Sequence, residues 1–137
     1  MILTADYHTH TPYSDGNDSV YKNALAAKEK GLQALGITDH GFSHIFFGLR
    51  RKQVAAQKKE IEQVESEIGI KILHGMESNL LSIEGDTDML ETDMPNFDIY
   101  ICGIHEAPRY KTFKDQKNLF FKNWIAYKKV VSPSKKL

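Results

Sequence analysis

Four short apolar runs, each predicted to be a β-strand, lead directly to a histidine or a glutamate. The runs cover residues 2–10, 34–38, 70–76 and 98–104, and the side chains at their ends are His10, His40, Glu77 and His105. Helical patterns separate the first three strands, which predicts parallel pairing with right-handed crossovers. Because the carboxyl ends of parallel strands meet on one face, we expect these four side chains to gather there.

Two helices are predicted between the strands. Asp18 or Ser19 caps the first, over residues 20–30, and Gly31 stops it. The second runs over residues 49–68 and stops at Gly69. Its apolar face, at spacings of seven, three and four, consists of Val54, Ile61, Val64 and Ile68.

The C-terminal third of the chain is less regular. The acidic segment 78–96 matches neither the helical period nor the two-residue period of a strand. A fourth strand is predicted after it, at 98–104. Thr112 and Asp115 resemble a capping box that starts a last helix. Its predicted core-facing stripe is Phe120, Trp124, Tyr127 and Val131.

Composition indicates one compact domain. The chain has 137 residues, 41% of them apolar, with 18 basic and 18 acidic side chains. A balanced charge gives no general case for binding nucleic acid or membranes, and we see no secretion signal and no apolar run of about 20 residues. A single cysteine excludes a disulfide framework and a thiolate zinc site, which fits the reducing cytoplasm, the expected location.

A His-x-His pair closes the first predicted strand. His8 and His10 are two residues apart, so both rings point to the same face and can bind one metal ion, with Asp6 on that side as a supporting partner. Alone, the pair also fits two incidental histidines. Asp15, five residues later in a tight turn, can fold back as an oxygen ligand. Histidine and carboxylate ligands suit zinc, manganese or iron better than calcium or magnesium.

Other polar residues near the strand ends have two interpretations each. Asp39 orients a ligand or bridges metals, or it caps a helix; His44 contacts substrate or lies on the surface. Four basic side chains follow site-forming strands and either contact a phosphate or form solvated surface charge. They are Arg50, Arg51, Arg109 and Lys111.

Strand parity separates two residues from the site. If Glu77 faces the site, His74 points the other way and is expected to pack under a helix. Cys102 lies on the side opposite His105 and is expected to be a small buried residue.

Taken in order, these elements resemble the PHP (polymerase and histidinol phosphatase) family. The matching residues are Asp6-x-His8-x-His10-Thr11-x-Tyr13-Ser14-Asp15-Gly16, Ile37-Thr38-Asp39-His40, Gly75-Met76-Glu77 and Gly103-Ile104-His105-Glu106. They extend over residues 6–106, and the Gly-x-His-Glu element is most similar to the histidinol-phosphatase-like and YcdX-like branch.

The resemblance implies an α/β fold, namely the N-terminal part, about four βα units, of a distorted seven-stranded TIM-like β/α barrel. It implies up to three divalent metals (zinc, manganese or iron) in a complete domain, and hydrolysis of a small phosphate monoester by metal-activated water. The implied metal ligands are His8 and His10 for one ion, Glu77 between two ions, Asp15 and His40 for a second or shared ion, and His105 for the third. The expected catalytic residues are Asp39, His40 and Glu77, and the expected substrate contacts are His44, Arg50 and Arg109.

The resemblance also implies that the domain is incomplete. The family supplies further ligands late in its chain, whereas this sequence has no histidine after His105. Four strands cannot close a seven-stranded barrel, so the first and fourth would be edges with unpaired backbone groups. We therefore expect residues 1–137 to need a C-terminal half or self-association, and to bind fewer metals and hydrolyse poorly alone.

Two alternatives remain open. Amidohydrolase-type barrels also place His-x-His on the first strand, although the Thr-Asp-His and Gly-x-Glu elements favour the PHP interpretation. PHP modules also occur on DNA polymerases, and a shortened one could be a scaffold without activity. The balanced charge offers no broad basic groove, so nucleic acid is not the expected partner.

Overall fold

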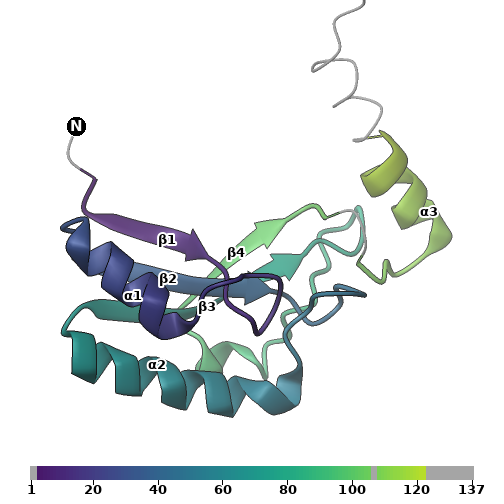
Figure 1. Ribbon diagram of the computed structural model, residues 1–137. Coiled ribbons are helices and arrows are strands. Elements are labelled where there is room, and N and C mark those ends of the chain that lie inside the picture. The colour runs from purple at the N-terminus through teal and green to yellow at the C-terminus, as the bar shows by residue number, and fades with distance from the viewer. Residues whose placement is uncertain (1–2, 106–107, 123–137) are drawn as a thin grey trace, which may run out of the picture.

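The computed structural model describes residues 3–105 and 108–122 of the chain. Four strands form one parallel sheet in the order β1-β2-β3-β4, as the alternating pattern predicts (Figure 1). The elements are β1 (Ala5–Thr9), α1 (Val20–Glu29), β2 (Ala34–His40), α2 (Val54–Ile68), β3 (Lys71–Asn79), β4 (Ile99–Gly103) and α3 (Phe113–Asp115), with single-turn helices at Arg51–Gln53 and Met94–Asn96. Such a parallel α/β sheet is consistent with part of a TIM-like barrel.

Helices α1 and α2 lie side by side on one face of the sheet (Figure 1). Two predicted helix ends are confirmed. The Ser19 hydroxyl caps the N-terminus of α1, and Gly69, at φ 71°, ends α2. The core lies between these helices and the outward side chains of β2 and β3. It consists of Val20, Ala24, Ala27, Leu35, Ile37, Ile61, Val64, Ile68, Ile70 and Ile72.

Several element boundaries differ from the predicted ones. The second helix begins at Val54 rather than Leu49, because Leu49 is buried and its backbone N–H donates to His40 O at 2.8 Å. The middle strands run further than predicted, since β2 and β3 stay in register through the pair His40 and Glu77. Both ligand-type residues therefore lie on paired strands rather than in loops.

The sheet has two open edges, β1 and β4, among the residues that the structure describes. Cys102, predicted to be buried, is exposed, so that prediction is wrong. Its neighbour Tyr100 on the same side of β4 is also exposed, because α1 and α2 pack mainly on β2 and β3. Cys102 is the register partner of Ser78, whereas Ile101 pairs with Glu77, so Cys102 and Glu77 lie on opposite faces of the sheet.

The last helix starts where the sequence predicts, with the Thr112 hydroxyl accepting from the Asp115 backbone N–H. It widens into a π-helical turn at Gln116–Phe121, where Leu119 is buried and Phe120 half-buried. The rest of the predicted stripe, Trp124, Tyr127 and Val131, lies outside the described residues. Within residues 3–105 and 108–122, no helix is long and apolar enough to cross a membrane.

Candidate metal centre

Six ligand-type side chains converge at the carboxyl ends of the strands. They are His8 on β1, His10 and Asp15 just after it, His40 on β2, Glu77 on β3, and His105 after β4. In three trios, one ligand atom from each residue lies within 4.8 Å of the others. The trios are His8, His10 and Glu77; His10, Asp15 and His40; and His40, Glu77 and His105.

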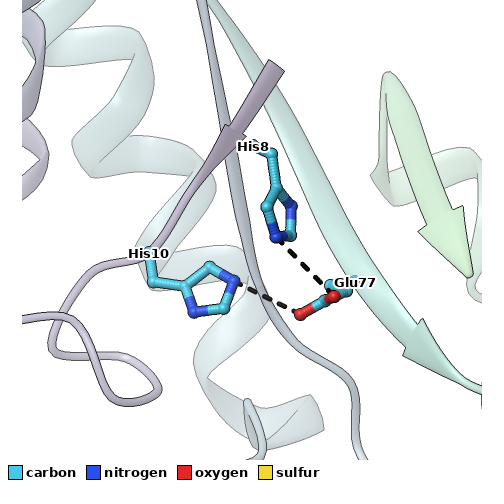
Figure 2. A group of neighbouring side chains, drawn as sticks. All are labelled: His8, His10 and Glu77. Carbon is cyan, nitrogen blue, oxygen red and sulfur yellow. Dashed lines mark ion pairs between the residues drawn. The ribbon is translucent and has the colours of Figure 1, made fainter. Parts of the chain in front are cut away.

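Glu77 connects four imidazoles through its two oxygens. Figure 2 shows two of them, with His8 Nε2 at 3.6 Å from Glu77 Oε1 and His10 Nε2 at 3.3 Å from Oε2. On the other side, His40 Nδ1 lies 3.0 Å from Oε2 and His105 Nε2 lies 3.1 Å from Oε1. The carboxylate, whose side chain is only 13% exposed, is therefore the common member around which the rings are arranged.

Asp15 approaches the opposite nitrogens of two of these rings. Its Oδ1 lies 2.8 Å from His10 Nδ1 and its Oδ2 lies 3.4 Å from His40 Nε2. The loop after β1 thus folds back, as the sequence predicts. His10 and His40 each have one nitrogen facing Glu77 and the other facing Asp15.

The strand geometry explains how the rings reach one another. His40 and Glu77 are direct register partners, so their side chains share one face of the sheet. A bulge in β1 between Asp6 and Thr9 breaks its register with β2 just before the ligands. The Asp6 carboxylate accepts from the His8 backbone N–H at 3.1 Å, and no described contact joins it to a ligand ring.

Thr38 is a site residue to which sequence reasoning assigned no role. Its hydroxyl lies 3.1 Å from His8 Nδ1, so it can fix the orientation of the ring that presents Nε2 to Glu77. The signal was present, because Thr38 is two residues before His40 and so faces the same side of β2. The His10 backbone is held too, since the Asn23 side-chain N–H donates to its carbonyl at 2.9 Å.

Asp39, predicted to be catalytic, lies outside all three trios. Its buried carboxylate accepts hydrogen bonds from the loop after β1 and from the Gln57 side chain, and it caps neither α1 nor α2. His74 is buried on the helix side of the sheet, as predicted, with Nε2 at 3.0 Å from Gln57 Oε1. Burial lowers its pKa, which favours the neutral ring.

His44 stacks on the cluster without joining a trio. Its ring lies 4.8 Å from the His40 ring at 20°, and its Nδ1 accepts from the Phe47 backbone N–H. Desolvation and the neighbouring His40 and His105 lower the pKa of His44. A neutral ring whose Nδ1 is an acceptor carries its proton on Nε2.

The four basic residues after the strands divide into two groups. Arg51 pairs with Asp93 at 2.8 Å and lies over the Phe42 ring, and Lys111 pairs with Asp86 at 2.8 Å. These two cations are engaged with the protein itself. Arg50 and Arg109 are exposed, and neither forms an ion pair with another of the described residues.

Proximity to carboxylates shifts the protonation of the site. The hydrogen bond to Glu77 raises the pKa of His10 to about 9, against the opposing effect of burial. Burial also disfavours the Glu77 carboxylate, but hydrogen bonds from His10, His105 and His40 outweigh it and hold its pKa well below the usual range. For Asp15, the hydrogen bond from His10 similarly outweighs desolvation and lowers the pKa.

The donor set fits divalent metal ions. Three buried ring nitrogens, His10 Nε2, His40 Nδ1 and His105 Nδ1, make no well-directed hydrogen bond among the described residues, although the first two face Glu77 Oε2 at 3.3 and 3.0 Å. An unsatisfied buried polar atom costs about 1–3 kcal/mol, so nitrogens left in this state indicate a missing partner such as a cation. A Cβ at Gly103 would lie 3.1 Å from Glu77 Oε1 and 2.9 Å from His105 Cε1, so glycine keeps the centre open.

Metal affinity is expected to rise with pH between 6 and 8. With its pKa raised to about 9, His10 carries a proton at neutral pH that a metal must displace, and one competing proton changes affinity about ten-fold per pH unit. Calorimetry of Zn²⁺ binding at pH 7, in two buffers of different ionisation enthalpy, should show about one proton released from His10. Affinity independent of pH, with no proton release, would contradict this picture.

The fold and the site together define a class: a parallel α/β chain with a candidate multinuclear metal centre at the carboxyl ends of its strands. The chain belongs to the PHP domain family, which it matches over residues 6–132. The family resemblance read from the residues at positions 6–106 is therefore confirmed. The family match also favours the PHP interpretation over the amidohydrolase alternative.

Curated relatives include both phosphatases and a polymerase. The chain is 34% identical over 114 residues to a probable phosphatase of Thermoanaerobacter sp. (strain X514), and 34% identical over 113 residues to a probable phosphatase of Vibrio campbellii. It is 33% identical over 107 residues to the DNA polymerase/3'-5' exonuclease PolX of Bacillus subtilis. These matches cover 77–78% of this chain, but 41–42% of the two phosphatases and 19% of PolX.

Proposed function

We propose that this chain carries the N-terminal part of a metal-dependent phosphoesterase that hydrolyses a small phosphate monoester, of the histidinol-phosphatase-like kind. The observation that carries the proposal is the convergence of six ligand-type side chains into three trios that share members. The names of the probable phosphatases among the relatives support it.

In this proposal, the trios are the metal sites. His8, His10 and Glu77 would hold one ion, while His40 would be shared between the trio with Asp15 and the trio with Glu77 and His105. Imidazole and carboxylate donors favour zinc, manganese or iron, with up to three ions in a complete domain. When bound, such cations polarise a phosphoryl oxygen and lower the pKa of coordinated water.

The chain's own residues would position the phosphate. His44 has an Nε2–H with no described partner, on a ring stacked beside His40, and it is suited to donate to a phosphoryl or leaving-group oxygen. Arg50 and Arg109, exposed near the strand ends, would attract the anionic substrate. Asp39 would act at a distance, through the loop that it anchors, while Glu77 and His40 remain the predicted catalytic residues.

The open edges at β1 and β4 support a larger domain. In this proposal, further strands pair with both edges and complete a seven-stranded barrel, supplied by more of the polypeptide or by self-association. The chain spans about two fifths of the probable phosphatases, which agrees with a domain only partly present here. Full activity is accordingly expected of the completed domain.

One specific observation favours a second candidate. The similarity to PolX is comparable in identity to that of the phosphatases, so the chain could instead be a PHP module that works beside a polymerase on nucleic acid. The two candidates share the metal centre and differ in the substrate.

Hydrolysis of p-nitrophenyl phosphate by the 137-residue chain tests the proposal. After chelation and reloading with Mn²⁺, we expect slow turnover that requires the metal and is lost in His40→Asn, since His40 belongs to two trios. The exposed Glu84→Gln serves as the control and should match the wild type. Mn²⁺ binding without phosphomonoester hydrolysis, together with removal of nucleotides from single-stranded DNA, would favour the polymerase module instead.

A further inference from the structure

A buried carboxylate lies just behind the candidate metal centre and is fully engaged by hydrogen bonds. Asp39, which is 0% exposed, accepts from Thr11 N and Thr11 Oγ1, both at 2.7 Å. It also accepts from Ser14 Oγ at 2.5 Å and from Gln57 Nε2 at 2.6 Å. Three of the four donors belong to the loop that carries Asp15, so this carboxylate is the anchor of that loop.

Gln57 connects the anchor on β2 to His74 on β3. Because its amide nitrogen donates to Asp39, its oxygen Oε1 faces His74 Nε2 at 3.0 Å. The other ring nitrogen of His74 lies 2.9 Å from Asn96 O, in the segment before β4. A continuous polar chain, the Asp39–Gln57–His74 relay, thus links β3, α2, β2 and the loop after β1.

The position of Gln57 on its helix is unusual for a polar residue. It lies within the buried face of α2, between Val54 and Ile61, and is itself 0% exposed. An apolar side chain would be the default there, and a buried amide is tolerated only when its hydrogen bonds are made. The relay supplies both bonds, one to Asp39 and one to His74.

The Asp39 end of the relay is connected to Asp15 through Ser14. Ser14 Oγ, bonded to Asp39, is also 3.4 Å from Asp15 Oδ1. The turn is tight, because Ser14 N and Gly16 N both donate to Thr11 O at 3.0 Å. Fixing Thr11 and Ser14 therefore fixes where Asp15 meets His10 and His40.

We propose that Gln57 is a positioning residue for the metal centre: the Asp39–Gln57–His74 relay holds the loop after β1 so that Asp15 completes the trio with His10 and His40. The inference rests on the proposed metal centre and concerns one part of it. Losing the relay leaves the trios around Glu77 in place and weakens the site that uses Asp15.

Co²⁺ binding to the whole 137-residue chain tests this, because its visible absorption reports the ligand set independently of activity. Gln57→Met keeps the side-chain length but removes both hydrogen bonds. We expect Co²⁺ affinity at the Asp15 site to fall about ten-fold, as is usual when a group that orients a ligand is lost, with the same spectral change as Asp15→Asn. Gln63→Met, at an exposed position of α2, should bind Co²⁺ like the wild type.

A second comparison separates positioning from general destabilisation. Val64→Ala opens a cavity under the same helix without touching Asp39, so it should lower stability yet leave the Co²⁺ spectrum unchanged. In the double variant Gln57→Met with Asp15→Asn, the affinity losses should not add, because both act on one ligand. If Gln57→Met does not fold, Ser14→Ala, at a half-buried position, removes the hydrogen bond by which the Asp39 end of the relay holds the loop.

The outcomes are distinct. A wild-type isotherm and spectrum in Gln57→Met, or in Ser14→Ala where that variant replaces it, overturns the relay alone. Additive losses of Co²⁺ affinity in the double variant would also overturn the relay. A loss of Co²⁺ affinity in Val64→Ala equal to that in Gln57→Met would overturn it too. A wild-type chain that binds no Co²⁺ overturns the proposed metal centre and this inference with it.

Discussion

Glu77→Gln is expected to reduce the affinity of the chain for Zn²⁺ by more than about 100-fold, beyond the 10–100-fold typical of losing a group that merely orients a ligand. Glu77 belongs to two of the three trios, and its oxygens face four imidazoles. Glutamine keeps the shape but removes the charge and turns one acceptor into a donor that a cation repels. Isothermal titration calorimetry measures the loss.

A second effect should accompany the first in the metal-free protein. The hydrogen bond to Glu77 is the main cause of the raised pKa of His10, so that pKa should fall toward 6.5 in Glu77→Gln. Titration of the ring by NMR would show it. Glu84→Gln, the same change at an exposed position, should alter neither value. Near wild-type Zn²⁺ affinity in Glu77→Gln would mean that the carboxylate is not a ligand.

The convergence of the site was predictable because it follows from strand geometry. His40 ends β2 and Glu77 lies two residues before the end of β3, and their direct pairing on neighbouring parallel strands brings them together. His8 and His10 follow the two-residue period of an extended chain. The same two-residue alternation correctly predicted that His74 faces away from the site and toward α2.

The residues that support the ligands were harder to find, because their partners are distant in sequence. Gln57 sits in an apolar helical stripe, where the pattern alone offers no reason for an amide, and its partners are 18 and 17 residues away. The position of Asp39 beside His40 predicted a role in the site. Its actual contacts, however, depend on how the loop after β1 folds over it. The prediction that Cys102 is buried was wrong for another reason. The alternation of side chains gives the side of the strand on which a residue lies, but not whether a helix covers that side.

Chelation of the metal-loaded chain is expected to lower its melting temperature by about 10 °C. An ion present at about 100 times its dissociation constant stabilises the folded state by about 2.7 kcal/mol, and a domain of this size gains about 4 °C per kcal/mol. The gain follows because binding satisfies His10 Nε2 and His40 Nδ1, which are otherwise buried without a well-directed hydrogen bond. Differential scanning calorimetry with Zn²⁺ and then excess EDTA measures it. His40→Asn should respond far less, since it breaks two trios, whereas equal melting temperatures with and without Zn²⁺ in the wild type would show that the folded chain holds no such site.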